Sequence, residues 1–124
     1  MRYLRAEFVQ WYGLFGAALA WTAQHLIVFG VGYADCLGAS RRWGLDVTTW
    51  TIVATVIGGG LAVLAEAAAI RVLRSTRALD YDDAPPLGRQ HFFAYAAALG
   101  NILFLGAILL NCVGALANTT CRPS

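Results

Sequence analysis

The sequence has little charge and no lysine. Only 13% of its 124 residues are charged, against roughly a quarter in an ordinary soluble domain, and all nine basic residues are arginine. Hydrophobic residues make up 59% of the chain, and the mean hydropathy is +0.60. This balance excludes an ordinary soluble domain and predicts an integral membrane protein. The net charge of +2, without a basic patch, argues against nucleic acid as a partner.

The residues that hold metals and cofactors are also scarce. The two histidines, His25 and His91, are expected at opposite faces of the membrane, whereas a b-type haem normally needs two axial ligands. No cysteine and histidine pair has zinc-ligand spacing, and the sequence has no glycine-rich phosphate loop or serine in a nucleophile turn. We therefore expect neither a cofactor nor an enzymatic activity.

Three apolar segments are long enough to cross a bilayer: about 11–33, 49–70 and 92–117. Each crossing needs about 20 residues, so residues 1–124 make one transmembrane domain. The fold class predicted is all-α, an integral membrane three-helix bundle whose partner is the lipid bilayer.

The arginines predict the orientation. Two precede the first span and four lie between the second and third, namely Arg2, Arg5, Arg71, Arg74, Arg77 and Arg89. The opposite side has three, namely Arg41, Arg42 and Arg122. By the positive-inside rule, the N-terminus is cytoplasmic and the C-terminus is outside. The exclusive use of arginine, with abundant alanine and glycine, suggests a bacterial source and hence the bacterial inner (plasma) membrane as the location of this multi-pass protein.

Two cysteines are expected at the outer face. Cys36 follows the first span and Cys121 follows the third, which sends both to the same oxidising compartment. A disulfide between them would close a long loop and stabilise the fold by on the order of 4 kcal/mol. Cys112 is expected inside the third span as a small packing residue.

Small residues recur along the predicted helix faces. Gly58 and Ala62 are four residues apart in the second span, and Gly100 and Ala107 are seven apart in the third. Such spacing lets helices approach closely in lipid. These surfaces serve either packing within the bundle or a partner interface, and the run Gly58-Gly59-Gly60 offers more small surface than two neighbouring helices require.

One acidic residue lies inside a span. Glu66 is about 7 Å from the cytoplasmic edge by helical rise, and its side chain leans toward the bilayer centre. An acid there costs about 2.5–3.5 kcal/mol on insertion scales, so Glu66 should face protein. Asn101 of the third span reaches a similar depth, and we expect the two side chains to meet.

A second polar layer is expected nearer the outer face. Gln24 and His25 of the first span and Asn111 of the third lie at comparable depth. We expect these long side chains to contact one another as buried, hydrogen-bonded groups rather than as metal ligands.

The order of motifs also resembles a known group of proteins. The stretches "QWYGLFGAALAWTAQH", "ADC", "LAEAAAIRVLRSTR", "RQHFFAYAAALGNILFLGAILL" and "TTC" follow one another along nearly the whole chain. Together they look like small three-span bacterial membrane proteins encoded beside haem-copper cytochrome c oxidase subunits. The resemblance implies an accessory or assembly role in a respiratory oxidase, with other subunits as partners, and it supplies no catalytic residues. Its paired cysteines agree with Cys36 and Cys121.

The sequence is compatible with two functions. The first is a non-catalytic accessory or assembly subunit of a respiratory membrane complex of the cytochrome c oxidase type. The alternative is a small oligomeric transporter or channel in which Glu66 and Asn101, with the Gln24 and His25 layer, line a polar path.

Overall fold

Three long helices form the protein. The computed structural model describes residues 2–36, 46–77 and 87–117. The helices are α1 (Arg2–Cys36), α3 (Val47–Ser75) and α4 (Leu87–Ala117). Because a backbone in hydrocarbon has no water to bond, long apolar segments satisfy their N–H and C=O groups within a helix. The predicted all-α three-helix fold is therefore confirmed for the described residues.

Each helix is long and apolar enough to cross a membrane. The candidate spans are Glu7–Ala34, Val47–Ser75 and Arg89–Ala117. They are longer than the apolar cores predicted from the sequence, because the helices continue through flanking polar residues. The prediction of three spans is confirmed as far as length and composition decide it, whereas the side on which each end lies stays a prediction.

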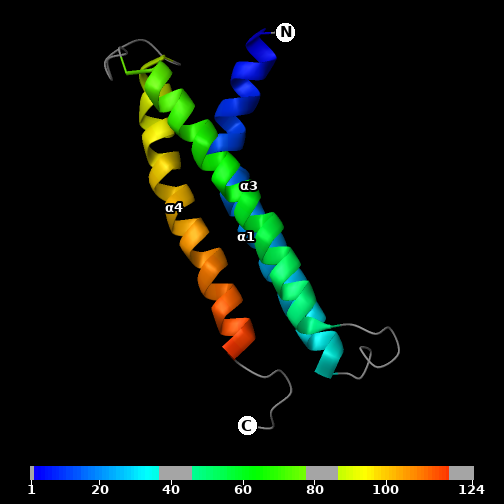
Figure 1. Ribbon diagram of the computed structural model, residues 1–124. Coiled ribbons are helices and arrows are strands. Elements are labelled where there is room, and N and C mark those ends of the chain that lie inside the picture. Colours follow the sequence, from blue (N-terminus) through cyan, green and yellow to red (C-terminus); the bar gives the residue numbers. More distant parts are fainter. Residues whose placement is uncertain (1, 37–45, 78–86, 118–124) are drawn as a thin grey trace.

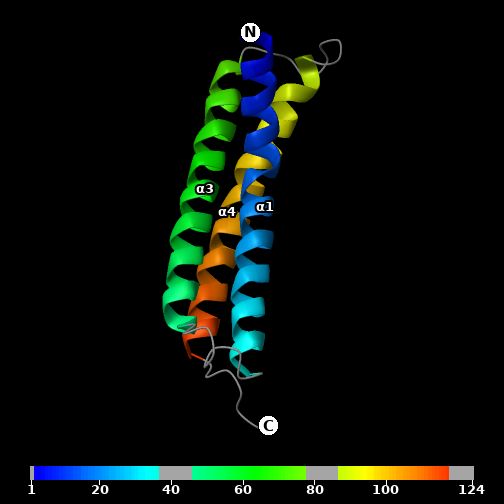
Figure 2. The ribbon, with the colours of Figure 1, turned by 90° about the vertical axis from the view of Figure 1, so that its right-hand side faces the viewer.

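The helices run alternately up, down and up. α1 and α4 point the same way and α3 runs antiparallel to both, so the start of α1 and the end of α4 lie at opposite ends of the bundle (Figures 1 and 2). Every helix packs against the other two. The first turns of α1 diverge from α3 and α4 (Figure 1), and the side chains of Phe8 and Trp11 there are 69% and 58% exposed.

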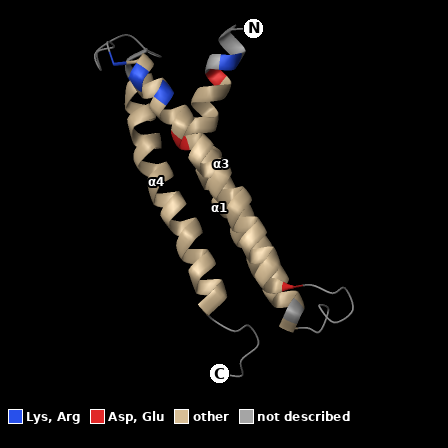
Figure 3. Cartoon of the chain, viewed as in Figure 1, with Lys and Arg blue, Asp and Glu red and all other residues tan. Residues whose placement is uncertain are grey.

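Charged residues lie toward the helix ends, and the long middle sections are uncharged except at Glu66 (Figure 3). The end where α1 begins and α3 finishes has Arg5, Arg71, Arg74 and Arg77 among its described residues. This is the distribution expected if that end faces the cytoplasm.

The ends of α3 are fixed by side chains. At its start, the Asp46 carboxylate accepts hydrogen bonds from the Thr48 N–H at 3.1 Å and from the Thr49 hydroxyl at 2.7 Å. This N-cap satisfies a backbone donor that the helix leaves unpaired, and the bond from Thr49 holds the pKa of Asp46 below its usual value. At the other end, the Thr76 hydroxyl donates to the Val72 carbonyl at 2.8 Å and lies 3.0 Å from His91 Nδ1 of α4.

Glycine and alanine bring α1 and α3 close together. A Cβ placed on Gly13 would lie 3.0 Å from the Ala69 nitrogen, and one on Gly16 would lie 2.9 Å from the Ala65 Cβ. Gly58 is also at this interface, where a Cβ would lie 3.3 Å from the Gln24 Cβ. In lipid, such close backbone approach supplies the van der Waals packing that holds helices together.

The predicted packing residues divide into two groups. Gly58 and Ala62 are buried against α1, so self-packing within the bundle accounts for them. Gly100 is half-buried, and a Cβ there would meet no described atom within 4 Å. Ala107 is only half-buried. The spacing of Gly58 and Ala62 agrees with close packing, whereas a packing role for Gly100 and Ala107 stays a prediction.

Candidate functional site

The first polar cluster joins all three helices, and we call it the Asn101 layer: Gly13 of α1, Glu66 of α3 and Asn101 of α4. The Asn101 side chain is 2% exposed, and its Nδ2 donates to the Gly13 carbonyl oxygen at 2.7 Å. Asn101 is also within hydrogen-bonding reach of the Glu66 carboxyl group, so the structure brings the two predicted residues together. The Glu66 Oε2 atom is buried with no hydrogen-bond partner among the described residues.

The second polar cluster also joins all three helices, and we call it the Asn111 layer: Gln24 of α1, Thr55 of α3 and Asn111 of α4. Asn111 Nδ2 donates to Gln24 Oε1 at 2.8 Å, and Gln24 Nε2 donates to Thr55 Oγ1 at 3.2 Å. Gln24 is 2% exposed and is the centre of this chain. The expected contact between Gln24 and Asn111 is present, and Thr55 is a member that sequence reasoning missed.

An apolar core separates the two layers. Asn101 and Asn111 are about 15 Å apart along α4 by helical rise. Between them lie side chains with almost no exposure, including Ala17, Ala62 and Ile108 at 0%, 1% and 0%. The polar groups therefore form two separate interhelical hydrogen-bonded layers at different depths rather than one continuous polar path through the bundle.

His25 does not join the Asn111 layer as a hydrogen-bonded member, contrary to the sequence prediction. Its side chain is exposed, and its ring stacks on the Trp21 ring with centroids 5.5 Å apart. No hydrogen bond joins it to another described residue. The neighbouring position, Gln24, points into the bundle, and a step of one residue turns the side chain by about 100° around the helix.

Backbone carbonyls supply two contacts that the sequence does not mark. Gly13 accepts the Asn101 amide, and the Leu61 carbonyl oxygen accepts the Tyr12 hydroxyl at 2.7 Å. Because every residue has a backbone carbonyl, the sequence does not show which carbonyl accepts a side-chain hydrogen bond. The one signal is that Gly13 has no side chain to shield its carbonyl.

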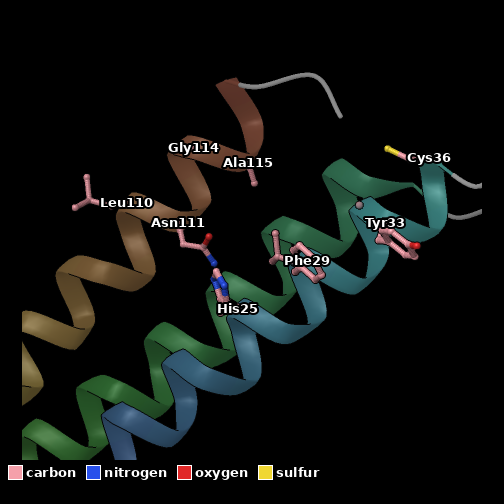
Figure 4. Close-up of a pocket in the computed structure, with 10 residues that line it drawn as sticks. His25, Phe29, Tyr33, Cys36, Leu110, Asn111, Gly114 and Ala115 are labelled. Carbon is pink, nitrogen blue, oxygen red and sulfur yellow. The ribbon is translucent and has the colours of Figure 1, made fainter. Parts of the chain in front are cut away.

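A cleft opens between α1 and α4, and we call it the α1–α4 cleft. It runs from His25 to Cys36 on α1 and from Leu110 to Ala115 on α4, with a volume of about 480 Å³. Figure 4 shows His25 and Asn111 beside each other at one end, Phe29 and Tyr33 further along α1, and Cys36 at the far end. Its walls are mainly apolar and aromatic.

The cysteines differ in state. Cys112, in α4, is half-buried and free, as expected for a packing residue. Cys36 ends α1 and is not a free thiol. Cys121 lies outside the described residues, so its disulfide with Cys36 stays a prediction.

Among residues 2–36, 46–77 and 87–117, no three histidine, cysteine, aspartate or glutamate side chains cluster in a way that could hold a metal ion. The two layers combine amides, a hydroxyl, a carboxyl group and a backbone carbonyl, and these groups chiefly bond one another.

The fold defines a class: an all-helical bundle of three helices, each able to cross a membrane, as in a multi-pass membrane protein. Comparison of the chain with models of protein families, with curated proteins and with solved structures finds no match.

Proposed function

We propose that this protein is a non-catalytic accessory or assembly subunit of a larger membrane complex. The motif order that resembles the three-span proteins encoded beside cytochrome c oxidase subunits makes a respiratory oxidase of the bacterial inner membrane the favoured complex. In this proposal the N-terminus is cytoplasmic, and partner helices cover part of the bundle surface.

The observation that carries the proposal is the position of glycines that the bundle does not use. A Cβ on Gly59 or Gly60 of α3, or on Gly100 or Gly106 of α4, would meet no described atom within 4 Å. In a helix interior each glycine costs about 0.8–1 kcal/mol relative to alanine. Within the chain these four positions gain no close contact in return. A second membrane helix can approach such positions closely.

The bundle also leaves most of its surface available. Between 22% and 28% of the residues in the most apolar part of each helix are buried within the chain. Leu103 and Leu110 of α4 are 75% and 73% exposed. Lipid or a partner subunit must cover these side chains, and the four glycines with open surroundings favour a partner over part of them.

The alternative function is an oligomeric transporter with Glu66 and Asn101 in its path. The unpartnered Glu66 Oε2 atom favours it, whereas the apolar core between the two polar layers argues against a path through one bundle. Glu66→Gln separates the two proposals. A transporter would show altered ion or proton flux in liposomes, whereas an accessory subunit would show altered assembly only.

The test of the accessory role is affinity purification of the tagged protein from native membranes in mild detergent. We expect haem-containing respiratory subunits to co-migrate with the wild-type chain. Gly60→Leu should reduce their yield, while Val53→Leu, which enlarges an exposed side chain of the same helix at a position without glycine, should retain it. A protein that never co-migrates with haem or another respiratory subunit would contradict the proposal.

A further inference from the structure

The α1–α4 cleft has the dimensions of a small-molecule site. Its volume of about 480 Å³ falls within the roughly 300–1,000 Å³ of ligand pockets, which occur between helices of bundles and combine apolar walls with a few polar groups. From His25 to Cys36 the helical rise gives a length of about 16 Å. A site of this length and volume suits a small, slender molecule.

His25 and Asn111 lie at the deep end of the cleft, and Tyr33 and Cys36 lie at its outer end (Figure 4). His25 is about 12 Å from Tyr33 along α1, in the interior of a membrane span. The His25 ring has no hydrogen bond to another described residue. Asn111 uses one amide hydrogen on Gln24 and keeps a second hydrogen and its Oδ1 atom. In hydrocarbon an unpaired polar group is unfavourable, so this end of the cleft requires a hydrogen-bonding partner.

The walls favour a flat ring. The Phe29 and Tyr33 rings stack with centroids 6.3 Å apart, and the His25 ring stacks on Trp21. Aromatic faces of this kind accept a further ring in an offset arrangement. Phe29 and Tyr33 are also 65% and 60% exposed, which leaves the cleft open on the lipid side.

We infer that the α1–α4 cleft binds an uncharged, lipid-soluble molecule with a flat, carbonyl-bearing head group, the chemistry of a quinone. The carbonyl oxygen accepts a hydrogen bond from Asn111 or His25, the ring lies along the aromatic wall, and an apolar tail leaves through the open side. A phospholipid fits less well, because its head group would lie beside Tyr33 at the outer end and its acyl chain would leave His25 and Asn111 without a hydrogen-bonding partner. The inference stands independently of the proposed partner subunits.

A second cleft, of about 450 Å³, lies beside Tyr12 and Leu61 and differs from the α1–α4 cleft in its polar groups. The Tyr12 hydroxyl in its wall already donates to the Leu61 carbonyl. The other polar group of the lining is the Trp11 indole N–H, which can donate but not accept, whereas Asn111 offers both a donor and an acceptor.

The test uses the full chain in phosphatidylcholine nanodiscs, with decylubiquinone as the probe. Bound quinone near Trp21 should quench tryptophan fluorescence saturably. Gly114→Leu fills the cleft at a position where a Cβ meets no described atom within 4 Å, and it should weaken binding roughly tenfold or more. Gly106→Leu makes the same change on α4 outside the cleft and should leave binding unchanged.

His25→Phe provides an independent variant, because it keeps a ring on Trp21 and removes the imidazole. It should weaken binding about threefold to tenfold, as one lost hydrogen bond predicts. Quenching that rises without saturation and is identical in all four proteins would overturn the inference. Displacement of decylubiquinone by equimolar palmitic acid would assign the cleft to acyl chains and would overturn it as well.

Discussion

The close approach of α1 and α3 makes Gly13→Ala a sharp test of the packing. The new Cβ would lie 3.0 Å from the Ala69 nitrogen and 3.2 Å from the Ala69 Cα, where 3.4–4 Å is ordinary contact. Both neighbours are backbone atoms, so neither can rotate away, and the helices must separate by a few tenths of an ångström.

The expected change in the free energy of unfolding follows from two opposing effects. Overpacking a close contact costs about 1–3 kcal/mol, whereas replacing a helical glycine by alanine gains about 0.5–1 kcal/mol. Gly30→Ala on the same helix gains the second effect alone, because nothing lies within 4 Å of its new Cβ. The two variants should therefore differ in free energy of unfolding by about 1–3 kcal/mol, with Gly13→Ala the less stable.

The assay is reversible unfolding in mixed micelles with increasing dodecyl sulfate, followed by circular dichroism and tryptophan fluorescence. Both variants are compared with the wild type at one protein concentration. If Gly13→Ala were as stable as Gly30→Ala, the close contact between α1 and α3 would be refuted.

Three further outcomes are expected. In the same assay, Gln24→Leu should lower the free energy of unfolding by about 1–2 kcal/mol, because it breaks both hydrogen bonds of the Asn111 layer. The control is Thr22→Val, which should change stability little because the Thr22 hydroxyl bonds only its own helix. Equal losses in the two variants would contradict a stabilising role for the Asn111 layer. The pKa of Asp46 is lowered because its carboxylate accepts a hydrogen bond from the Thr49 hydroxyl. The stability advantage of wild type over Asp46→Ala should therefore be complete above pH 3.8 and decline as the pH falls through the lowered pKa. A difference in stability that does not depend on pH would contradict the N-cap. In non-reducing mass spectrometry, alkylation should modify Cys112 alone, and reaction of all three cysteines would exclude the predicted disulfide.

The sequence was enough to predict the spans and their number. Hydropathy over some twenty residues decides whether a segment can cross a bilayer, and this needs no knowledge of neighbours. Helical rise also placed Gln24 level with Asn111, and Glu66 level with Asn101, because depth in a membrane is nearly proportional to residue number.

Rotation around the helix was harder to predict than depth. His25 is adjacent to Gln24 in sequence but is exposed beside the α1–α4 cleft, whereas Gln24 is buried. Which face of an apolar helix turns inward depends on the partner helix, and an almost uniformly apolar surface gives little signal for it. The Gly13 acceptor escaped detection because it belongs to the backbone.

Site-directed labelling of the middle helix, α3, tests most directly whether the bundle crosses a membrane. In a cysteine-free background, single cysteines replace Thr48 and Ser75 at the two ends of α3 and Ala62 in its middle. A membrane-impermeant maleimide applied to the outside of intact spheroplasts should label Thr48→Cys, spare Ser75→Cys until the membrane is opened, and spare Ala62→Cys throughout. Labelling of both ends from the outside would contradict a membrane-spanning α3 and, with it, the three-helix bundle as a transmembrane structure.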